Sequence, residues 1–163
     1  MTTLYLAAGC FWGAQHFLQQ LPGVESTRVG YANGRTENPT YEQVKHEGTG
    51  HAETVEVVYD EKRLSTPELL ECYFMTIDPT SVNKQGEDEG EQYRTGIYYT
   101  DADQLPEIET VYAEQTEKAG ARLAVEIRPL ENFFTAEEYH QKYLDKNPGG
   151  YCHIPRKSFK LGE

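Results

Sequence analysis

The chain has 163 residues, a hydrophobic content of 37% and a formal net charge of −12, from 27 acidic and 15 basic residues. This length predicts a single domain spanning residues 1–163, with enough apolar residues for a core of its own. The acidic excess argues against nucleic acid and anionic membrane as partners, because both are bound through basic surface. No apolar stretch approaches the roughly 20 residues that cross a bilayer, and the N-terminus lacks the pattern of a signal peptide. We therefore expect a cytoplasmic monomer.

Hydrophobic periodicity and turn residues predict alternating strands and helices. In chain order we expect a strand at 4–8, a helix at 11–20, strands at 24–29 and 51–59 flanking a helical turn at 41–45, a helix at 66–77, a strand at 94–100, a helix at 103–119, a strand at 123–129 and a helix at 135–143. Thr40 is a predicted helix cap, the segments 65–68 and 135–138 read as capping boxes, and Gly120 ends a helix. Residues 78–93 are predicted to form a long functional loop, and the chain is expected to be irregular from 146 on.

The order strand, helix, strand, strand, helix, strand is typical of the split β-α-β arrangement. The predicted fold is therefore α+β: a two-layer sandwich in which helices cover one face of a mixed sheet with a ferredoxin-like core, followed by an irregular C-terminal tail.

The most informative motif is Gly9-Cys10-Phe11-Trp12-Gly13, which joins the first strand to the first helix. A thiol at a helix N-terminus has a lowered pKa because the helix dipole favours negative charge, so Cys10 is a candidate nucleophile. Its position alone is equally compatible with a small buried hydrophobe. Trp12 lies off the apolar stripe of its helix and indicates a small apolar pocket beside the thiol, with simple surface cover as the alternative.

A second candidate is Glu53, because alternation along strand 51–59 places it on the apolar face with Val55, Val57 and Tyr59. Burial raises a carboxyl pKa, which makes Glu53 a candidate acid near neutral pH. The alternative is that Glu53 lies in water at the end of the strand, which is the commoner fate of such a residue.

Other residues carry weaker signals. Tyr41 and Tyr93 fall in or beside irregular segments where their hydroxyls could converge on a ligand. Cys152 lies in a glycine-containing tail, from which a second thiol could reach Cys10, or it is an idle surface cysteine. Cys72 is read as core packing. The histidines lack the spacing of a zinc site, and phosphate-loop and Gly-x-Ser-x-Gly motifs are absent, so neither a metal nor a cofactor is expected.

Taken together, the motifs resemble those of the A-type peptide methionine sulfoxide reductases. Beyond the segment 9–13, blocks similar to those of the family follow in order over nearly the full chain: Gly30-Tyr31, Asn38-Pro39-Thr40-Tyr41, Thr49-Gly50-His51-Ala52-Glu53, Asp78-Pro79-Thr80, Gln92-Tyr93-Arg94, the run 139–144, Lys146-Asn147-Pro148 and Gly150-Tyr151-Cys152.

The resemblance implies reduction of the S epimer of methionine sulfoxide, free or in proteins, to methionine. Cys10 would attack the sulfoxide sulfur and become a sulfenic acid, and Cys152 would resolve it to a disulfide that thioredoxin reduces. Glu53 would supply a proton to the sulfoxide oxygen. The substrate-binding residues implied by the family pattern are Phe11, Trp12, Tyr41, Asp88, Tyr93, His140, Tyr143 and Tyr151.

The chain departs from the common family pattern at Ile77, at Glu87 and at Asn33-Gly34, and it has no cysteine after Cys152. Two other functions fit some of the residues. A peroxide-reducing thiol enzyme would use both cysteines but leaves the apolar pair Phe11 and Trp12 without a role. A non-catalytic binder of oxidised methionine peptides leaves Cys152 unexplained.

Overall fold

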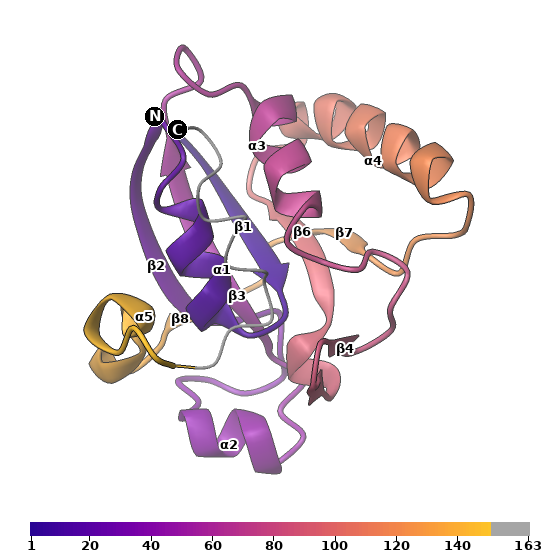
Figure 1. Ribbon diagram of the computed structural model, residues 1–163. Helices are drawn as coiled ribbons and strands as arrows, with labels where there is room; N and C mark the ends of the chain where they lie inside the picture. The colour runs from indigo at the N-terminus through magenta and orange to yellow at the C-terminus, as the bar shows by residue number, and fades with distance from the viewer. Residues whose placement is uncertain (151–163) are drawn as a thin grey trace.

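The computed structural model is described for residues 1–150, and its centre is a six-stranded mixed sheet (Figure 1). The strands of this sheet are β1 (Thr2–Ala8), β2 (Val24–Ala32), β3 (Ala52–Tyr59), β6 (Thr95–Tyr99), β7 (Glu126–Pro129) and β8 (Phe133–Thr135). Their order across the sheet is β7-β6-β1-β3-β2-β8. Only the β6–β7 pair is parallel among these neighbours. The central position belongs to β1 and β3, so residues at their ends are flanked by strands on both sides.

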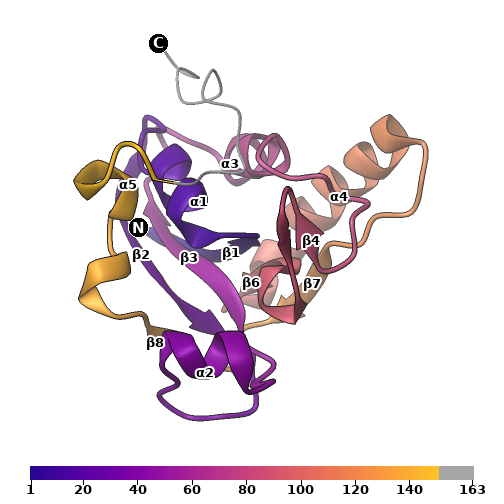
Figure 2. The same ribbon diagram turned by 60° about the horizontal axis from the view of Figure 1, so that its bottom comes forward.

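The helices are gathered mainly over one face of the sheet. They are α1 (Phe11–Leu18), α2 (Tyr41–His46), α3 (Thr66–Phe74), α4 (Leu105–Ala119) and α5 (Tyr143–Lys146), with 3-10 turns η1 (Glu91–Tyr93), η2 (Ala102–Gln104) and η3 (Glu138–His140). Helices α1 and α3 lie over the sheet, and α4 packs beside α3 (Figure 2). Within residues 1–150, no helix is long and apolar enough to cross a membrane.

The main hydrophobic core lies between these helices and the sheet. The fully buried Leu4, Leu6, Val55 and Val57 of β1 and β3 contribute to it, with apolar side chains from α1 and α3. A smaller apolar cluster, which includes Ala7, Ala52 and Tyr98, forms a second group. Because strand side chains alternate between faces, Ala52 and Glu53 point in opposite directions, and Glu53 faces the main core.

Most of the elements predicted from the sequence are present, with bounds displaced by a few residues. Capping boxes form at Thr40 with Gln43 and at Ser65 with Glu68, and Gly120 ends α4 in a left-handed conformation. Strand β2 is longer than predicted because it continues to Ala32 in register with β3. The predicted loop 78–93 contains a short hairpin, β4 (Lys84–Gln85) and β5 (Asp88–Glu89), whose turn includes Gly86 at φ +61°.

The prediction of a capped helix over 135–143 is wrong. Thr135 is the last residue of β8, where it pairs with Gly30 of β2, and the Ala136 N–H donates to the Val29 carbonyl. The Gln141 side chain then accepts from the Val29 N–H and donates to the Val29 carbonyl, in the place of another strand. Pairing with the edge of the sheet thus outweighs the local capping pattern, and only η3 and α5 are helical in this segment.

We expect the buried hydroxyl of Tyr73 to be a main link between α3 and the sheet. It donates to the Ala7 carbonyl at 2.7 Å and accepts from the Gly96 N–H at 3.1 Å. Tyr73→Phe leaves both groups without this partner in a dry site, which costs roughly 1–3 kcal/mol of unfolding free energy in urea titrations. Tyr99→Phe is the control, because the Tyr99 hydroxyl of the parent makes no hydrogen bond within residues 1–150. Equal stability of the two variants contradicts this account.

Candidate active site

The site is built on the connection between β1 and α1. Strand β1 ends at Ala8, Gly9 turns the chain with φ +79°, and Cys10 occupies the N-cap position of α1. The Cys10 side chain makes no capping hydrogen bond, and the residue is only 7% exposed. The thiol therefore lies at the positive end of a helix, as the sequence predicts. It is nearly buried there, which the sequence left open.

Glu53 lies directly beneath this helix end. Strands β1 and β3 are antiparallel with Leu6 opposite Val55, so the chain leaves β1 beside Glu53. One carboxyl oxygen of Glu53, Oε1, accepts the Phe11 N–H at 3.2 Å, which satisfies one of the unpaired N–H groups at the start of α1. The other oxygen, Oε2, is buried and makes no hydrogen bond with any of residues 1–150.

The burial of Glu53 sets its charge. The residue is 1% exposed, and burial raises the pKa of its carboxyl from 4.5 to about 8, against the opposing effect of the Phe11 N–H. The negative charge of Asp88 raises this pKa further, while the Gln92 amide lowers it. Glu53 is consequently protonated at neutral pH. Its 1% exposure confirms the position on the apolar face that strand alternation predicts.

Two tyrosine hydroxyls join the carboxyl group. Burial and the nearby Glu53 raise the pKa of Tyr41 to about 12, with a hydrogen bond to Tyr93 opposing them. The pKa of Tyr93 is also raised, first by burial and then by Glu53 and Tyr41. Cys10 and Asp88 act on both tyrosines in the same direction. We call these five residues, Cys10, Tyr41, Glu53, Asp88 and Tyr93, the Cys10 cluster. They come from segments far apart in the sequence, and both hydroxyls keep their protons at neutral pH.

Glu137 positions Tyr41, and it is not among the site residues predicted from the sequence. Its two carboxylate oxygens accept from the Tyr31 hydroxyl at 2.8 Å and from the Tyr41 N–H at 2.9 Å. Although burial opposes the effect, these hydrogen bonds hold the pKa of Glu137 below its ordinary value. The carboxylate thus joins β2, the start of α2 and the segment before η3. Its only sequence signal is a place in a capping pattern, which favours a different role.

An aromatic wall of Trp12, His140 and Tyr143 borders the cluster. The Trp12 indole stacks on Tyr143 with ring centroids 3.8 Å apart and 11° between the planes. Its N–H donates to His140 Nδ1 at 2.9 Å. His140 also lies 4.6 Å from the Tyr41 ring and 5.1 Å from the Phe11 ring, centroid to centroid. Trp12 is only partly buried, although it packs against the main core, whereas Phe11 is buried at 1% exposure.

His140 is held in one tautomer. Because Nδ1 accepts the indole proton, the neutral ring carries its own proton on Nε2, which is buried and without a hydrogen bond among residues 1–150. Burial lowers the pKa of His140, so the ring is neutral at physiological pH. It adds an uncharged surface and one N–H donor.

Two predicted site residues, Tyr151 and Cys152, lie outside the described residues. Cys72 packs against the main core, as predicted, and burial raises the pKa of its thiol, the opposite of activation. Of the residues that depart from the family pattern, Ile77 packs against the core and Asn33 adopts a left-handed φ of +52° at the end of β2.

A cysteine at a helix N-cap, beside a protonated carboxyl group and two tyrosine hydroxyls, is the arrangement expected of a site for thiol chemistry. Comparison with known proteins identifies the family. The "Peptide methionine sulfoxide reductase" family matches residues 2–161. A Peptide methionine sulfoxide reductase MsrA from Lachnoclostridium phytofermentans is 57% identical over 157 residues, which cover 96% of this chain and 95% of that protein.

Comparison with solved structures supports the same family. The crystal structure of Mxr1 from Saccharomyces cerevisiae in reduced form superposes with a TM-score of 0.89 at 38% identity, covering 94% of this chain and 90% of that one. The same yeast protein in complex with Trx2 gives a TM-score of 0.61 at 26% identity, covering 86% and 83%. The chain belongs to the peptide methionine sulfoxide reductase family, and within it resembles the MsrA members.

The raised pKa of Glu53 links folding to pH. The folded protein holds the Glu53 proton more tightly than the unfolded chain does, and this difference stabilises the fold. The stabilisation is complete below about pH 4.5 and is lost as the pH rises to about 8. Glu53→Gln removes this titration. As the pH rises from 5 to 8.5, the unfolding free energy of the parent should therefore fall relative to that of the variant, by about 1.4 kcal/mol for each unit of pKa shift.

Glu56→Gln, on the same strand, is the control. A hydrogen bond with Arg28 lowers the pKa of Glu56, so its titration lies below this pH range. If the difference in unfolding free energy between Glu53→Gln and the parent stays constant from pH 5 to 8.5, Glu53 is not protonated in the folded protein.

Proposed function

We propose that this protein reduces the S epimer of methionine sulfoxide, free or in proteins, to methionine. The observation that carries the proposal is the convergence of a protonated Glu53 and the hydroxyls of Tyr41 and Tyr93 on the Cys10 position, in a chain that belongs to the peptide methionine sulfoxide reductase family. A sulfoxide oxygen needs hydrogen-bond donors as it gains charge, and three neutral O–H groups supply them.

In the proposed chemistry, the Cys10 thiolate attacks the sulfoxide sulfur while Glu53 transfers its proton to the sulfoxide oxygen. The attack forms a bond between Cys10 Sγ and the substrate sulfur. As the hydroxyl group passes to Cys10, this bond and the sulfur–oxygen bond both break, methionine leaves, and Cys10 becomes a sulfenic acid. The two electrons that reduce the substrate thus come from the Cys10 sulfur. Proton transfer from a positioned acid contributes typically 10²–10⁴-fold to a rate. Tyr41 and Tyr93 stabilise the oxygen through hydrogen bonds and keep their own protons.

The aromatic wall and Phe11 bind the methyl end of the substrate in this proposal. Trp12, held by its stack on Tyr143 and its bond to His140, presents an indole face that excludes water from the reacting sulfur. Asp88 acts by its charge, since it raises the pKa of Glu53 and so helps to keep the acid protonated. Tyr151 is proposed to complete the binding site.

Regeneration requires a second thiol and an external reductant. We propose that the Cys152 thiol attacks the sulfenic sulfur of Cys10, which releases water and forms a Cys10–Cys152 disulfide. Thioredoxin then reduces this disulfide with its own two thiols. The complex of the yeast relative with Trx2 supports this choice of partner.

The proposal extends to organisation and location. We propose that β1, α1, β2, β3, α3 and β6 form a split β-α-β core of the ferredoxin type, which is supported by the strand order β6-β1-β3-β2. A single domain over residues 1–163 is supported by a family match that runs from residue 2 to 161. The monomeric state and the cytoplasmic location stay predictions.

The direct test is turnover of the separated sulfoxide epimers with thioredoxin and its reductase. Only the S epimer should yield methionine, because the donors and the aromatic wall fix one arrangement of oxygen and methyl about the sulfur. Equal use of both epimers contradicts the proposal, and faster reduction of hydrogen peroxide favours the peroxidase alternative.

The Cys152→Ser variant tests the relay. It should release about one methionine per enzyme and then stop until a small thiol is added, because the sulfenic acid on Cys10 has no resolving partner. Quantifying methionine in a single burst, with mass spectrometry of Cys10, measures this. Cys72→Ser is the matched control and should turn over like the parent. Loss of the first turnover in Cys152→Ser contradicts the proposed division of labour.

A further inference from the structure

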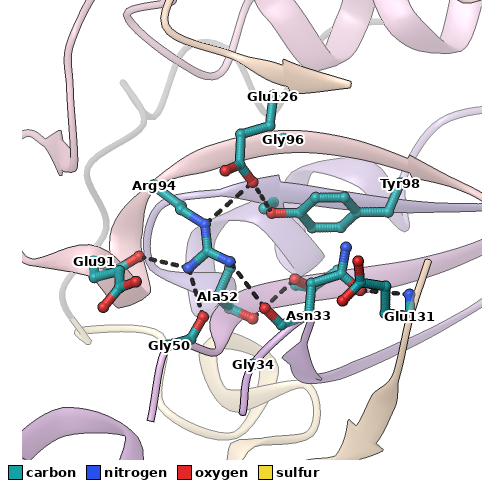
Figure 3. A network of polar contacts seen from close by, with 12 residues as sticks. Asn33, Gly34, Gly50, Ala52, Glu91, Arg94, Gly96, Tyr98, Glu126 and Glu131 are labelled. Carbon is teal, nitrogen blue, oxygen red and sulfur yellow. Dashed lines mark hydrogen bonds and ion pairs between the residues drawn. The ribbon is translucent and has the colours of Figure 1, made fainter. Parts of the chain in front are cut away.

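Arg94 lies outside the Cys10 cluster, yet it binds the backbone of three segments that lead to it. It follows η1 and precedes β6, and its side chain is 13% exposed. Nη1 donates to the Gly50 carbonyl at 2.9 Å and to the Glu91 carbonyl at 3.1 Å, and Nη2 donates to the Asn33 carbonyl at 3.3 Å. Figure 3 shows the guanidinium between these groups.

Each of the three carbonyls belongs to a segment that carries or supports a residue of the cluster. Gly50 stands three residues before Glu53, in a left-handed conformation with φ +77°. Glu91 opens η1, the turn that presents Tyr93. Asn33 follows β2, whose Tyr31 binds Glu137 and thereby Tyr41. One side chain therefore joins the segments that carry Glu53 and Tyr93 and the end of the strand that supports Tyr41 through Glu137.

The guanidinium is itself fixed from the opposite side. Glu126 of β7 accepts from Arg94 Nε at 3.1 Å, and the same carboxylate oxygen accepts the Tyr98 hydroxyl at 2.8 Å (Figure 3). A Cβ on Gly96 would lie 2.7 Å from the Tyr98 hydroxyl oxygen, so the missing side chain leaves room for this ring. The planar fork of an arginine suits this arrangement, since it holds several acceptors in fixed directions at once.

The contacts of Arg94 differ from those of an ordinary surface ion pair. Arg28, for comparison, makes two bonds to Glu56 on the neighbouring strand, a pairing that the sheet already holds in register. The carbonyls bound by Arg94 lie at a strand entrance, a 3-10 turn and a strand exit, where no sheet ladder fixes them. Arg94 therefore holds segments that the sheet itself does not hold.

We infer that Arg94 is a positioning residue for the reductase reaction: it sets the place of Tyr93 and holds the entrance to β3 closed, which keeps water from the buried Glu53 carboxyl group. The inference rests on the proposed function, in which Glu53 is the acid. Without Arg94 the entrance to β3 loosens, water reaches Glu53, and the carboxyl group ionises at lower pH.

The test compares Arg94→Met, Arg94→Lys and the control Arg28→Met with the parent. In single-turnover experiments on the reduced enzymes, Arg94→Met should lower the maximal rate of methionine formation about 10- to 100-fold, since small misplacements at a reacting centre have effects of this size. The half-saturating sulfoxide concentration should stay within about threefold of the parent, because the aromatic wall is intact. The alkaline limb of the pH–rate profile should move to lower pH.

The maximal rate and the alkaline limb of Arg94→Lys should lie between those of the parent and those of Arg94→Met. An ammonium group reaches one or two carbonyls but lacks the planar fork of a guanidinium. Arg28→Met should keep the rate and the alkaline limb of the parent, even with a lower melting temperature. A parent-like rate and limb in Arg94→Met overturn the inference. If that variant does not fold, a parent-like rate and limb in Arg94→Lys overturn it equally.

Two results separate this inference from the proposed function. If the parent enzyme itself forms no methionine, the proposed function fails. The position of Arg94 is then judged without activity, by ¹³C NMR titration of the Glu53 carboxyl carbon in the parent and in Arg94→Lys. A lower midpoint in the variant supports the positioning role, and an unchanged midpoint overturns it.

Discussion

The site depends on one constraint, the burial of an uncharged carboxyl group beneath the N-terminus of α1. Two forces compete at Glu53. The Phe11 N–H and the helix end favour a negative charge, while complete removal from water favours the protonated form. Burial prevails, and the pKa rises to about 8. The result is a carboxyl group that is still protonated at neutral pH, fixed through one oxygen by the Phe11 N–H and acted on also by the Gln92 amide.

Two levels of structure maintain this arrangement. The sheet fixes Glu53 and Cys10 relative to each other, because β1 and β3 pair at its centre and α1 follows β1 after a single glycine turn. The loops bring the hydroxyls of Tyr41 and Tyr93, and these depend on polar contacts from outside the cluster. Glu137 binds the start of α2, and Arg94 binds the turn that carries Tyr93. Thus ladder pairing places Glu53 and Cys10, whereas single side chains place the two tyrosine hydroxyls.

Sequence reasoning predicts the parts of the site that depend on local patterns. The strand-turn-helix at 4–20 and the alternation along β3 placed Cys10 and Glu53 correctly, since both follow from the period of one element. The residues Glu137 and Gln141 could not be found in this way, because their partners on β2 lie more than a hundred positions away. The same long-range pairing explains the wrong helix over 135–143, where β8 takes Thr135 from a plausible capping box. Family resemblance supplied the substrate, which no single element specifies.

The central claim is that Glu53 holds a proton at neutral pH and gives it to the sulfoxide oxygen. It is tested most directly by a ¹³C NMR titration of the Glu53 carboxyl carbon, with single-turnover rates of methionine formation measured on the same samples. The account predicts a carboxyl midpoint near 8 and a rate that falls at higher pH with the same midpoint. A midpoint near the ordinary value of 4.5, with full activity above it, would contradict the account.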